Sequence, residues 1–165
     1  MSEGSQTIES LLQNSSIQLY VIACNIRSAY NVGAILRTAD GAGNTAVVTT
    51  GYTPSPIHPK VDKTALGAAA SVPWCEAQLE QLLAVKNVVH VGLELSPRAI
   101  SIFEWEPPKM PIFLYIGNEV TGLDAELLMT LPVLVQLPMN GAKNSLNVAE
   151  ATSISIYELL RKRLT

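Results

Sequence analysis

Three short polar segments of this chain combine residue types that can bind and orient a small polar ligand. Residues 31–37 (NVGAILR) combine an amide, a glycine and a guanidinium within one helical stretch. Residues 117–122 (GNEVTG) place the Glu119 carboxylate in a glycine-rich turn, where it could hold a ribose hydroxyl or lie near a cation. Residues 137–147 (LPMNGAKNSLN) form a loop whose backbone N–H groups around Gly141 are suited to cradle a polar ligand. These segments are therefore the candidates for carrying chemistry.

Each segment also has a simpler structural interpretation. Asn31 is a good helix N-cap, and residues 117–122 are typical of a strand-to-helix turn. Asn144 or Ser145 could cap the final helix. Any one segment taken alone is therefore weak support for a functional site.

Other common chemistries lack their motifs. No GxGxxG pattern follows the first apolar strand and no Walker A sequence is present, which argues against a nicotinamide, flavin or nucleotide-triphosphate site. His58 and His90 are isolated, so neither a histidine metal site nor a nucleophile–histidine pair is supported. Cys24 and Cys75 are too few for a zinc site or a disulfide framework. We therefore expect no bound metal.

Strand-like and helix-like stretches alternate along the chain. The expected strands are 17–24, 45–51, 72–77, 88–95, 111–118 and 133–139. The expected helices are one capped by Asn31 and ended by Gly41 and Gly43, followed by 61–70, 79–85, 123–131 and 146–160. This alternation predicts an α/β fold with a parallel sheet, helices on both faces, and ligands at the carboxyl ends of the strands. We expect residues 1–16 to be flexible or a short helix and residues 17–165 to form one domain.

The final helix is unusually poor in charge. Between Val148 and Leu160 its only charged residues are Glu150 and Glu158. A helix that is apolar nearly all round is buried. Together with an apolar content of 48%, this leaves two alternatives open: the helix packs within its own domain, or it packs against a second subunit.

The overall charge is unlike that of most RNA-binding proteins. The net charge is −3, whereas proteins that neutralise phosphates usually carry a basic excess. Basic side chains nevertheless flank the candidate segments: Arg27, Arg37, Lys60, Lys63 and Lys143. No apolar run approaches the ~18 residues that span a bilayer, and the first residues do not resemble a signal peptide. We therefore expect a cytoplasmic protein without a membrane partner.

The chain resembles the SpoU (TrmH-like) family of the SPOUT superfamily of RNA methyltransferases. NVGAILRTADGAG, PIFLYIGNEVTGL and LPMNGAKNSLNVAEA look like the three signature segments of that family, in order. VDKTALGAAASVPW resembles the helix between its second and third strands, and the likeness covers about residues 19–160. The resemblance implies a C-terminal trefoil knot, a homodimer through the C-terminal helix, and S-adenosylmethionine as cofactor. It also implies methyl transfer to a ribose 2'-hydroxyl of RNA. The minimal length of the chain favours tRNA over rRNA as the acceptor.

The resemblance also implies site residues, carried over by position. The expected catalytic residues are Asn31, Arg37, Glu119, Ser145 and Asn147. The expected cofactor-binding residues are Leu93, Glu94, Gly117, Leu137, Met139, Ser145 and Leu146. An arginine is almost never neutral, so we expect Arg37 to stabilise the developing alkoxide and hold a phosphate rather than act as a base. Asn31 would orient the ribose or Arg37, and Glu119 would position the site by hydrogen bonds.

Three alternatives remain open at this point. The first is a superfamily enzyme that methylates an RNA base, and the second is a cofactor-binding regulatory protein without catalysis. The third, an α/β enzyme acting on a small molecule, has no motif to support it. Because many relatives carry an additional RNA-binding domain, the chain looks like a minimal catalytic domain, and we expect the dimer surface or a partner protein to help recognise the RNA.

Overall fold

The computed structural model of the protein describes residues 6–164, which contain one sheet of seven parallel strands. The strands are β1 (Leu19–Cys24), β2 (Thr45–Thr50), β3 (Trp74–Glu76), β4 (Val89–Leu93), β5 (Ile100–Ser101), β6 (Ile112–Ile116) and β7 (Val133–Gln136). The helices are α1 (Ile8–Leu12), α2 (Ala29–Ala42), α3 (Pro59–Ala65), α4 (Leu79–Leu83), α5 (Ala125–Thr130) and α6 (Val148–Leu164), with a 3₁₀ turn η1 (Ala68–Ala70). The strand order is β3-β2-β1-β6-β4-β7-β5.

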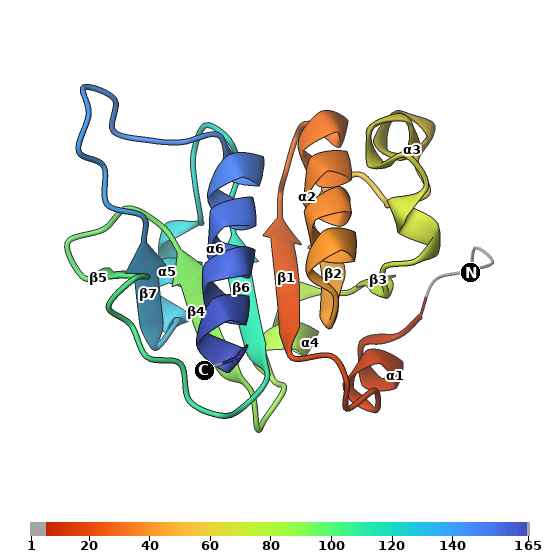
Figure 1. The fold of residues 1–165 in the computed structure, drawn as a ribbon, viewed down its shortest axis with the longest axis horizontal. Coiled ribbons are helices and arrows are strands. Elements are labelled where there is room, and N and C mark those ends of the chain that lie inside the picture. The colour runs from red at the N-terminus through yellow and green to blue at the C-terminus, as the bar shows by residue number, and fades with distance from the viewer. Residues whose placement is uncertain (1–5, 165) are drawn as a thin grey trace.

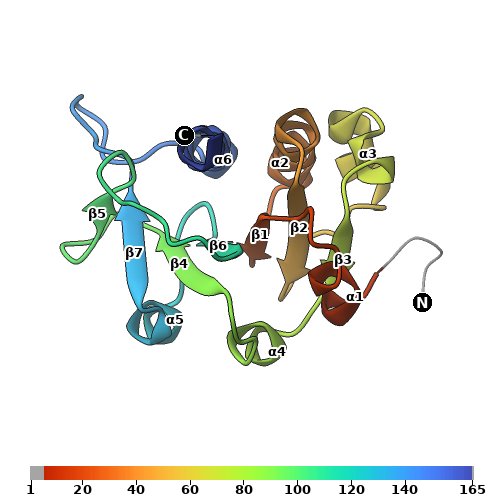
Figure 2. The same cartoon turned by 60° about the horizontal axis from the view of Figure 1, so that its bottom comes forward.

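Helices cover both faces of the sheet. Figure 2 shows α2, α3 and α6 on one face and α1, α4 and α5 on the other. The arrowhead of β1 in Figure 1 points toward the carboxyl edge of the sheet, and α2 and α6 both begin at this edge. The arrangement confirms the predicted α/β fold with a parallel sheet covered on both sides. The trefoil knot that the family resemblance implies stays a prediction.

The middle of the sheet is buried on both sides. Every residue of β1 and β6 is buried, with Val21 packed in one apolar cluster and Ile22 in the other. A parallel strand covered by helices on both faces must be apolar throughout, which is why these two strands read as continuous apolar runs. The same burial makes β1 and β6 a rigid base for the loops that follow them.

The predicted strands are all present, with ends shortened by one to three residues. The structure adds β5, which was not predicted because two residues carry no periodicity; Ile100 pairs with Val135 and Ser101 with Gln136. The predicted helix 61–70 is divided into α3 and η1. Leu66 and Gly67 adopt left-handed backbone conformations, with φ of 51° and 87°, and this ends α3.

The predicted caps of α2 and α6 were wrong. Ser28 caps α2, and its hydroxyl oxygen accepts from the Asn31 N–H at 3.3 Å. Asn31 lies inside the first turn and is only 3% exposed. Asn147, rather than Asn144 or Ser145, caps α6, because its side-chain oxygen accepts from the N–H groups of Ala149 and Glu150. Both asparagines are therefore held where helices begin at the carboxyl edge of the sheet.

The N-terminal segment 1–16 contains α1, and residues 1–5 lie outside the described residues. Thr7 caps α1, and Ile8 and Leu11 are buried in the apolar cluster beneath β1. This helix is therefore packed against the sheet. Within residues 6–164, no helix is both long enough and apolar enough to cross a membrane.

α6 packs against α2 within its own domain. The two helices run side by side in Figure 1, and the hydroxyls of Thr38 and Ser153 lie 2.7 Å apart between them. Ile156 and Leu159 are buried in the core beneath α6. The outer face of α6 is not covered within the domain, since Ile154 is 42% exposed and Tyr157 50% exposed, so burial of this face against a second subunit stays a prediction. Packing within the domain thus accounts for one side of α6 and leaves the other uncovered.

Candidate active site

A cavity of about 420 Å³ opens at the carboxyl ends of β4, β6 and β7, beside the start of α6. This volume lies within the usual range for small-molecule sites. All of the predicted cofactor-binding residues line the cavity: Leu93, Glu94, Gly117, Leu137, Met139, Ser145 and Leu146. Of the predicted catalytic residues, Glu119, Ser145 and Asn147 line it, whereas Asn31 and Arg37 do not. Three segments far apart in sequence thus meet at one edge of the sheet.

The glycine-rich turn 117–122 forms one wall of the cavity. Asn118 and Gly122 exchange backbone hydrogen bonds of 3.1 and 2.9 Å, so the turn closes on itself. A Cβ on Gly117 would lie only 2.2 Å from the backbone carbon of Gly122, and Gly122 itself has a φ of 70°. Only glycine fits at both positions. The segment is therefore a strand-to-helix turn that also lines the cavity, and its part in a functional site stays a prediction.

Glu94 joins the ends of two strands beside the cavity. One carboxylate oxygen accepts from the Leu95 N–H at 3.1 Å, and the other accepts from the Leu123 N–H at 2.9 Å. The end of β4 is thereby fastened to the segment that follows β6. Glu94 therefore shapes the cavity wall in addition to lining it.

Glu119 fastens the start of α2. Its carboxylate accepts from the backbone N–H groups of Arg27 and Ser28 and from the Asn31 side-chain amide, each at 2.9 Å. Partial burial raises the pKa of the Glu119 carboxyl, but these donors outweigh that effect and hold the pKa below its ordinary value. The side chain is therefore a carboxylate at neutral pH and serves as an acceptor.

Asn31 links Glu119 to the start of α6. While its amide nitrogen donates to Glu119, its oxygen accepts from the Asn147 amide at 3.2 Å. Glu119, Asn31 and Asn147 thus form a chain of hydrogen bonds, which we call the asparagine bridge, between the turn 117–122 and the two helix N-termini. The contacts of Asn31 indicate that it orients Glu119 and Asn147.

Arg37 lies apart from these residues. It is exposed on α2, six residues after Asn31, and among residues 6–164 its guanidinium makes no hydrogen bond or ion pair. Gly33, on the same helix, does not face the cavity either: a Cβ there would lie 2.7 Å from the Val61 carbonyl oxygen of α3. The catalytic role of Arg37 therefore stays a prediction.

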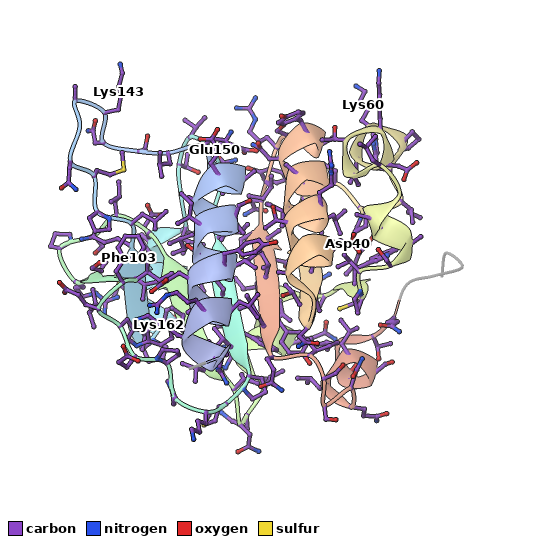
Figure 3. All side chains as sticks on the ribbon, viewed as in Figure 1. Asp40, Lys60, Phe103, Lys143, Glu150 and Lys162 are labelled. Atoms are coloured by element: carbon purple, nitrogen blue, oxygen red, sulfur yellow. The ribbon has the colours of Figure 1, made fainter. Side chains whose placement is uncertain are left out.

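The segment between β7 and α6 is an exposed loop. Figure 3 shows Lys143 at the tip of this loop, pointing away from the sheet. Ser145 and Leu146 lie at the end of the loop, where they border the cavity, and Leu146 is 41% exposed. The mouth of the cavity is thus formed partly by residues that contact little else.

Asn118 is one of the cavity-lining residues that were not predicted as site residues from the sequence. Asn118 is 7% exposed and lines the cavity, and its oxygen accepts from the Val120 and Thr121 N–H groups. Its amide nitrogen donates to the Asn25 carbonyl at 2.9 Å and to the Tyr52 hydroxyl at 3.0 Å. The available signal was its place directly after Gly117, at the carboxyl end of a buried strand.

Other reactive side chains are held in the core. Burial raises the pKa of the Cys24 and Cys75 thiols to about 12, so both stay protonated at neutral pH and are poor nucleophiles. His90 is partly buried, and its ring nitrogens lie 2.9 Å from the Tyr115 hydroxyl and 3.0 Å from the Val85 carbonyl oxygen, so both have structural partners. In the described part of the chain no group of three acidic, histidine or cysteine side chains is arranged to hold a metal ion.

The fold and the cavity define a parallel α/β domain with a cavity of small-molecule size at the carboxyl edge of its sheet. The model of the SpoU rRNA Methylase family matches residues 18–157. The chain belongs to this family.

Similar proteins are RNA methyltransferases by name. The 23S rRNA (guanosine-2'-O-)-methyltransferase RlmB of Pseudomonas putida is 31% identical over 171 residues, which cover 97% of this chain and 66% of that protein. The solved structure of an AdoMet-bound rRNA methyltransferase from Sinorhizobium meliloti superposes with a TM-score of 0.82 at 29% identity, covering 90% of this chain and 57% of that one. The A. aeolicus TrmH/SpoU tRNA modifying enzyme gives 0.78 at 28% identity, covering 90% and 76%. The chain therefore spans less than two thirds of the first two relatives.

Proposed function

We propose that this chain transfers a methyl group from S-adenosylmethionine to a ribose 2'-hydroxyl of RNA. The observation that carries the proposal is that two candidate segments, 117–122 and 137–147, line one cavity, and that the asparagine bridge joins the third, 31–37, to both of them. The cavity fits the cofactor, because Leu93, Leu137 and Leu146 offer apolar walls while Gly117 and Gly122 bring bare backbone to the ligand. Relatives of known structure include one described as bound to AdoMet.

In the proposed mechanism, some residues hold the cofactor and Arg37 stabilises the charge that develops on the ribose oxygen. When bound, S-adenosylmethionine supplies an electrophilic methyl group. The leucine walls and the turn 117–122 would hold and orient it, and the asparagine bridge would keep the starts of α2 and α6 fixed around it. Arg37, a permanent cation, would stabilise the negative charge that develops on the ribose oxygen and hold the neighbouring phosphate, while solvent takes the proton.

The proposal also specifies which RNA accepts the methyl group. The preference for tRNA rested only on the small size of the chain, whereas the first curated relatives are named as enzymes of 23S rRNA guanosines. We therefore propose ribosomal RNA, at a guanosine ribose, as the first acceptor, with tRNA as the second because of the structural likeness to a tRNA modifying enzyme. We place this activity in the cytoplasm, where both RNAs are found.

Methyl transfer with a labelled cofactor tests the function and its alternatives together. Ribosomal RNA and tRNA from a strain lacking the gene serve as acceptors, and the product nucleosides are identified by mass. A 2'-O-methylated guanosine in ribosomal RNA supports the proposal, and a ribose-methylated nucleoside in tRNA changes only the acceptor. A base-methylated nucleoside supports the base-methylating alternative. Cofactor binding without transfer to either RNA supports the regulatory protein.

We expect the cofactor to bind without RNA. The cavity walls come from strand ends and from turns closed by their own hydrogen bonds, so they need no RNA to form. Calorimetric titration with S-adenosylmethionine or its demethylated product is therefore expected to show saturable binding. Leu146→Trp, which fills the mouth at an exposed position, should weaken that binding at least tenfold. No heat and no thermal shift at millimolar ligand would contradict the cofactor assignment.

We further propose that the outer faces of α2 and α6 form a homodimer interface. Tyr30, Ile154 and Tyr157 are between 42% and 66% exposed on these two helices, which lie side by side. Large apolar side chains exposed on neighbouring helices are typical of an interface. Sedimentation at micromolar concentration should show a dimer, and Ile154→Glu should convert it to a monomer. Met129→Glu, at an 85% exposed position on α5, is the matched control that leaves the dimer intact.

A further inference from the structure

A tyrosine beside the cavity is held in place while most of its surface stays open. Tyr52 follows β2 and is 63% exposed. Its hydroxyl accepts from the Asn118 amide at 3.0 Å, and its backbone N–H donates to the Asn25 side-chain oxygen at 3.3 Å. An exposed tyrosine ordinarily leaves its hydroxyl in water. Here the ring is fixed at both ends, and the residue that fixes its hydroxyl lines the cavity.

The backbone before Tyr52 supports the same placement. Gly51 has a φ of 67°, and a Cβ there would collide with the Asn25 side-chain oxygen at 1.8 Å. The chain can therefore turn sharply after β2 only with glycine at this position. The turn brings Tyr52 across the end of β1 to Asn118, which follows β6.

A cation lies on the same rim. The backbone N–H of Arg27 donates to Glu119, another cavity residue, and the Arg27 side chain is exposed. Among residues 6–164 its guanidinium has no hydrogen-bond or ion-pair partner. The Tyr52 ring is thus held at the turn 117–122 through Asn118, and the Arg27 backbone, from which the guanidinium extends, is held at the same turn through Glu119.

We propose that Tyr52 stacks with an unpaired nucleobase of the RNA strand that enters the cavity, and that Arg27 holds a phosphate of that strand. The inference rests on the proposed function. Proteins that recognise RNA in loops and at ends stack splayed bases on aromatic rings, and an immobilised ring loses little freedom on binding. Because the chain has a net charge of −3, phosphate attraction is weak, and stacking carries a correspondingly larger share of the affinity.

Base stacking on Tyr52 and phosphate binding by Arg27 can be distinguished with two oligonucleotide probes. The first is a fluorescein-labelled single-stranded oligoadenylate of eight nucleotides; the second has the same ribose-phosphate chain with abasic positions in place of the bases. Anisotropy titration compares their affinities in the presence of the demethylated cofactor. We expect the unaltered protein to prefer the strand with bases, since only that strand can stack.

Tyr52→Ala should weaken binding of oligoadenylate about 5- to 150-fold and leave the abasic strand unchanged. Tyr52→Phe keeps the ring and should retain most of the preference, which separates stacking from a folding defect. Arg27→Gln should weaken binding of both strands by the same factor. Phe103→Ala, a 51% exposed aromatic on the far side of α6 from α2, should change neither (Figure 3).

Equal affinity of the unaltered protein for the two strands, including no measurable binding of either, would overturn the inference. So would a Tyr52→Ala variant that loses affinity for both strands equally or for neither. Cofactor titration and methyl transfer to ribosomal RNA on the same preparations keep the two proposals apart. If transfer persists without a preference for bases, only the stacking role fails; if the preference is present without cofactor binding or transfer, only the proposed function fails.

Discussion

Arg37→Ala should lower single-turnover methyl transfer about 100- to 1,000-fold, the usual effect of removing one donor aimed at a developing oxyanion. Cofactor affinity should stay nearly unchanged, because Arg37 does not line the cavity. Arg37→Lys should restore little, since an ammonium cannot present the planar fork that bridges a phosphate and a hydroxyl. The measurement is transfer of labelled methyl to RNA from a strain lacking the gene, alongside calorimetric titration of the cofactor.

Lys60→Ala is a matched control, because Lys60 is also an exposed cation near the carboxyl edge of the sheet (Figure 3). It should reduce transfer only modestly. If Arg37→Ala turns over at the rate of the unaltered protein, Arg37 is a surface residue of a capped helix and the proposed mechanism is wrong. The fold and the cofactor site would be unaffected by that result.

The distance of Arg37 from the cavity also raises the question of which chain it serves. Arg37 is exposed on α2, one of the two helices of the proposed dimer interface. Mixing the inactive variants Arg37→Ala and Leu146→Trp answers it. If Arg37 acts on the cavity of a second copy, mixed dimers contain one complete site and activity returns. If it acts on its own chain, the mixture stays inactive.

Glu119→Ala should affect stability and activity together. It leaves three N–H donors without their carboxylate acceptor, and hydrogen bonds to charged groups are worth ~1.5–3 kcal/mol each. Because Glu119 is exposed, water replaces part of each lost bond, and we expect a total loss of about 2 kcal/mol, or ~4–8 °C in Tm. Displacing the start of α2 should also lower methyl transfer about 100-fold. Glu104→Ala, an exposed glutamate on a loop, should change neither quantity.

The same carboxylate predicts a pH dependence. The pKa of Glu119 in the folded protein lies below its ordinary value of 4.5. A group with a depressed folded pKa contributes stability that is fully present above the unfolded pKa and is lost as pH falls through the folded pKa. The difference in unfolding free energy between the unaltered protein and Glu119→Gln should therefore be constant from about pH 9 to 5 and should shrink below about pH 4. A difference that shrinks near neutral pH would contradict the assignment.

The parts of the fold that sequence reasoning predicted are those fixed by burial. β1 and β6 are apolar throughout because both faces are covered, so their positions follow from composition alone. β5 could not be predicted, since Ile100 and Ser101 join the sheet only through their neighbours Val135 and Gln136. The local sequence pattern is therefore enough to predict a buried strand, whereas a short edge strand forms only through its pairing with the rest of the sheet.

The candidate site divides in the same way. The cavity-lining positions follow strand ends, so family likeness and topology both pointed to them. The cap of α2 was misassigned because asparagine is a common helix-capping residue. In the structure the Asn31 side-chain amide instead bonds to Glu119 and Asn147, which are 88 and 116 residues away in the sequence. The roles of Asn31 and Glu119 in holding the helix starts depend on contacts that no local window contains.

The place of β1 in the sheet has a consequence for how the chain reaches its folded state. One edge of β1 pairs with β2, but the other pairs with β6, so that Leu19 must meet Ile112 about 90 residues later in the chain. Pairing over such a separation is slow, because the intervening loop must close before the contacts form. While the protein is being synthesised, this edge of β1 stays open until residue 116 has emerged. An unpaired, apolar central strand can associate with other chains. Correct folding of this protein therefore depends on β6 pairing with β1 before such association occurs.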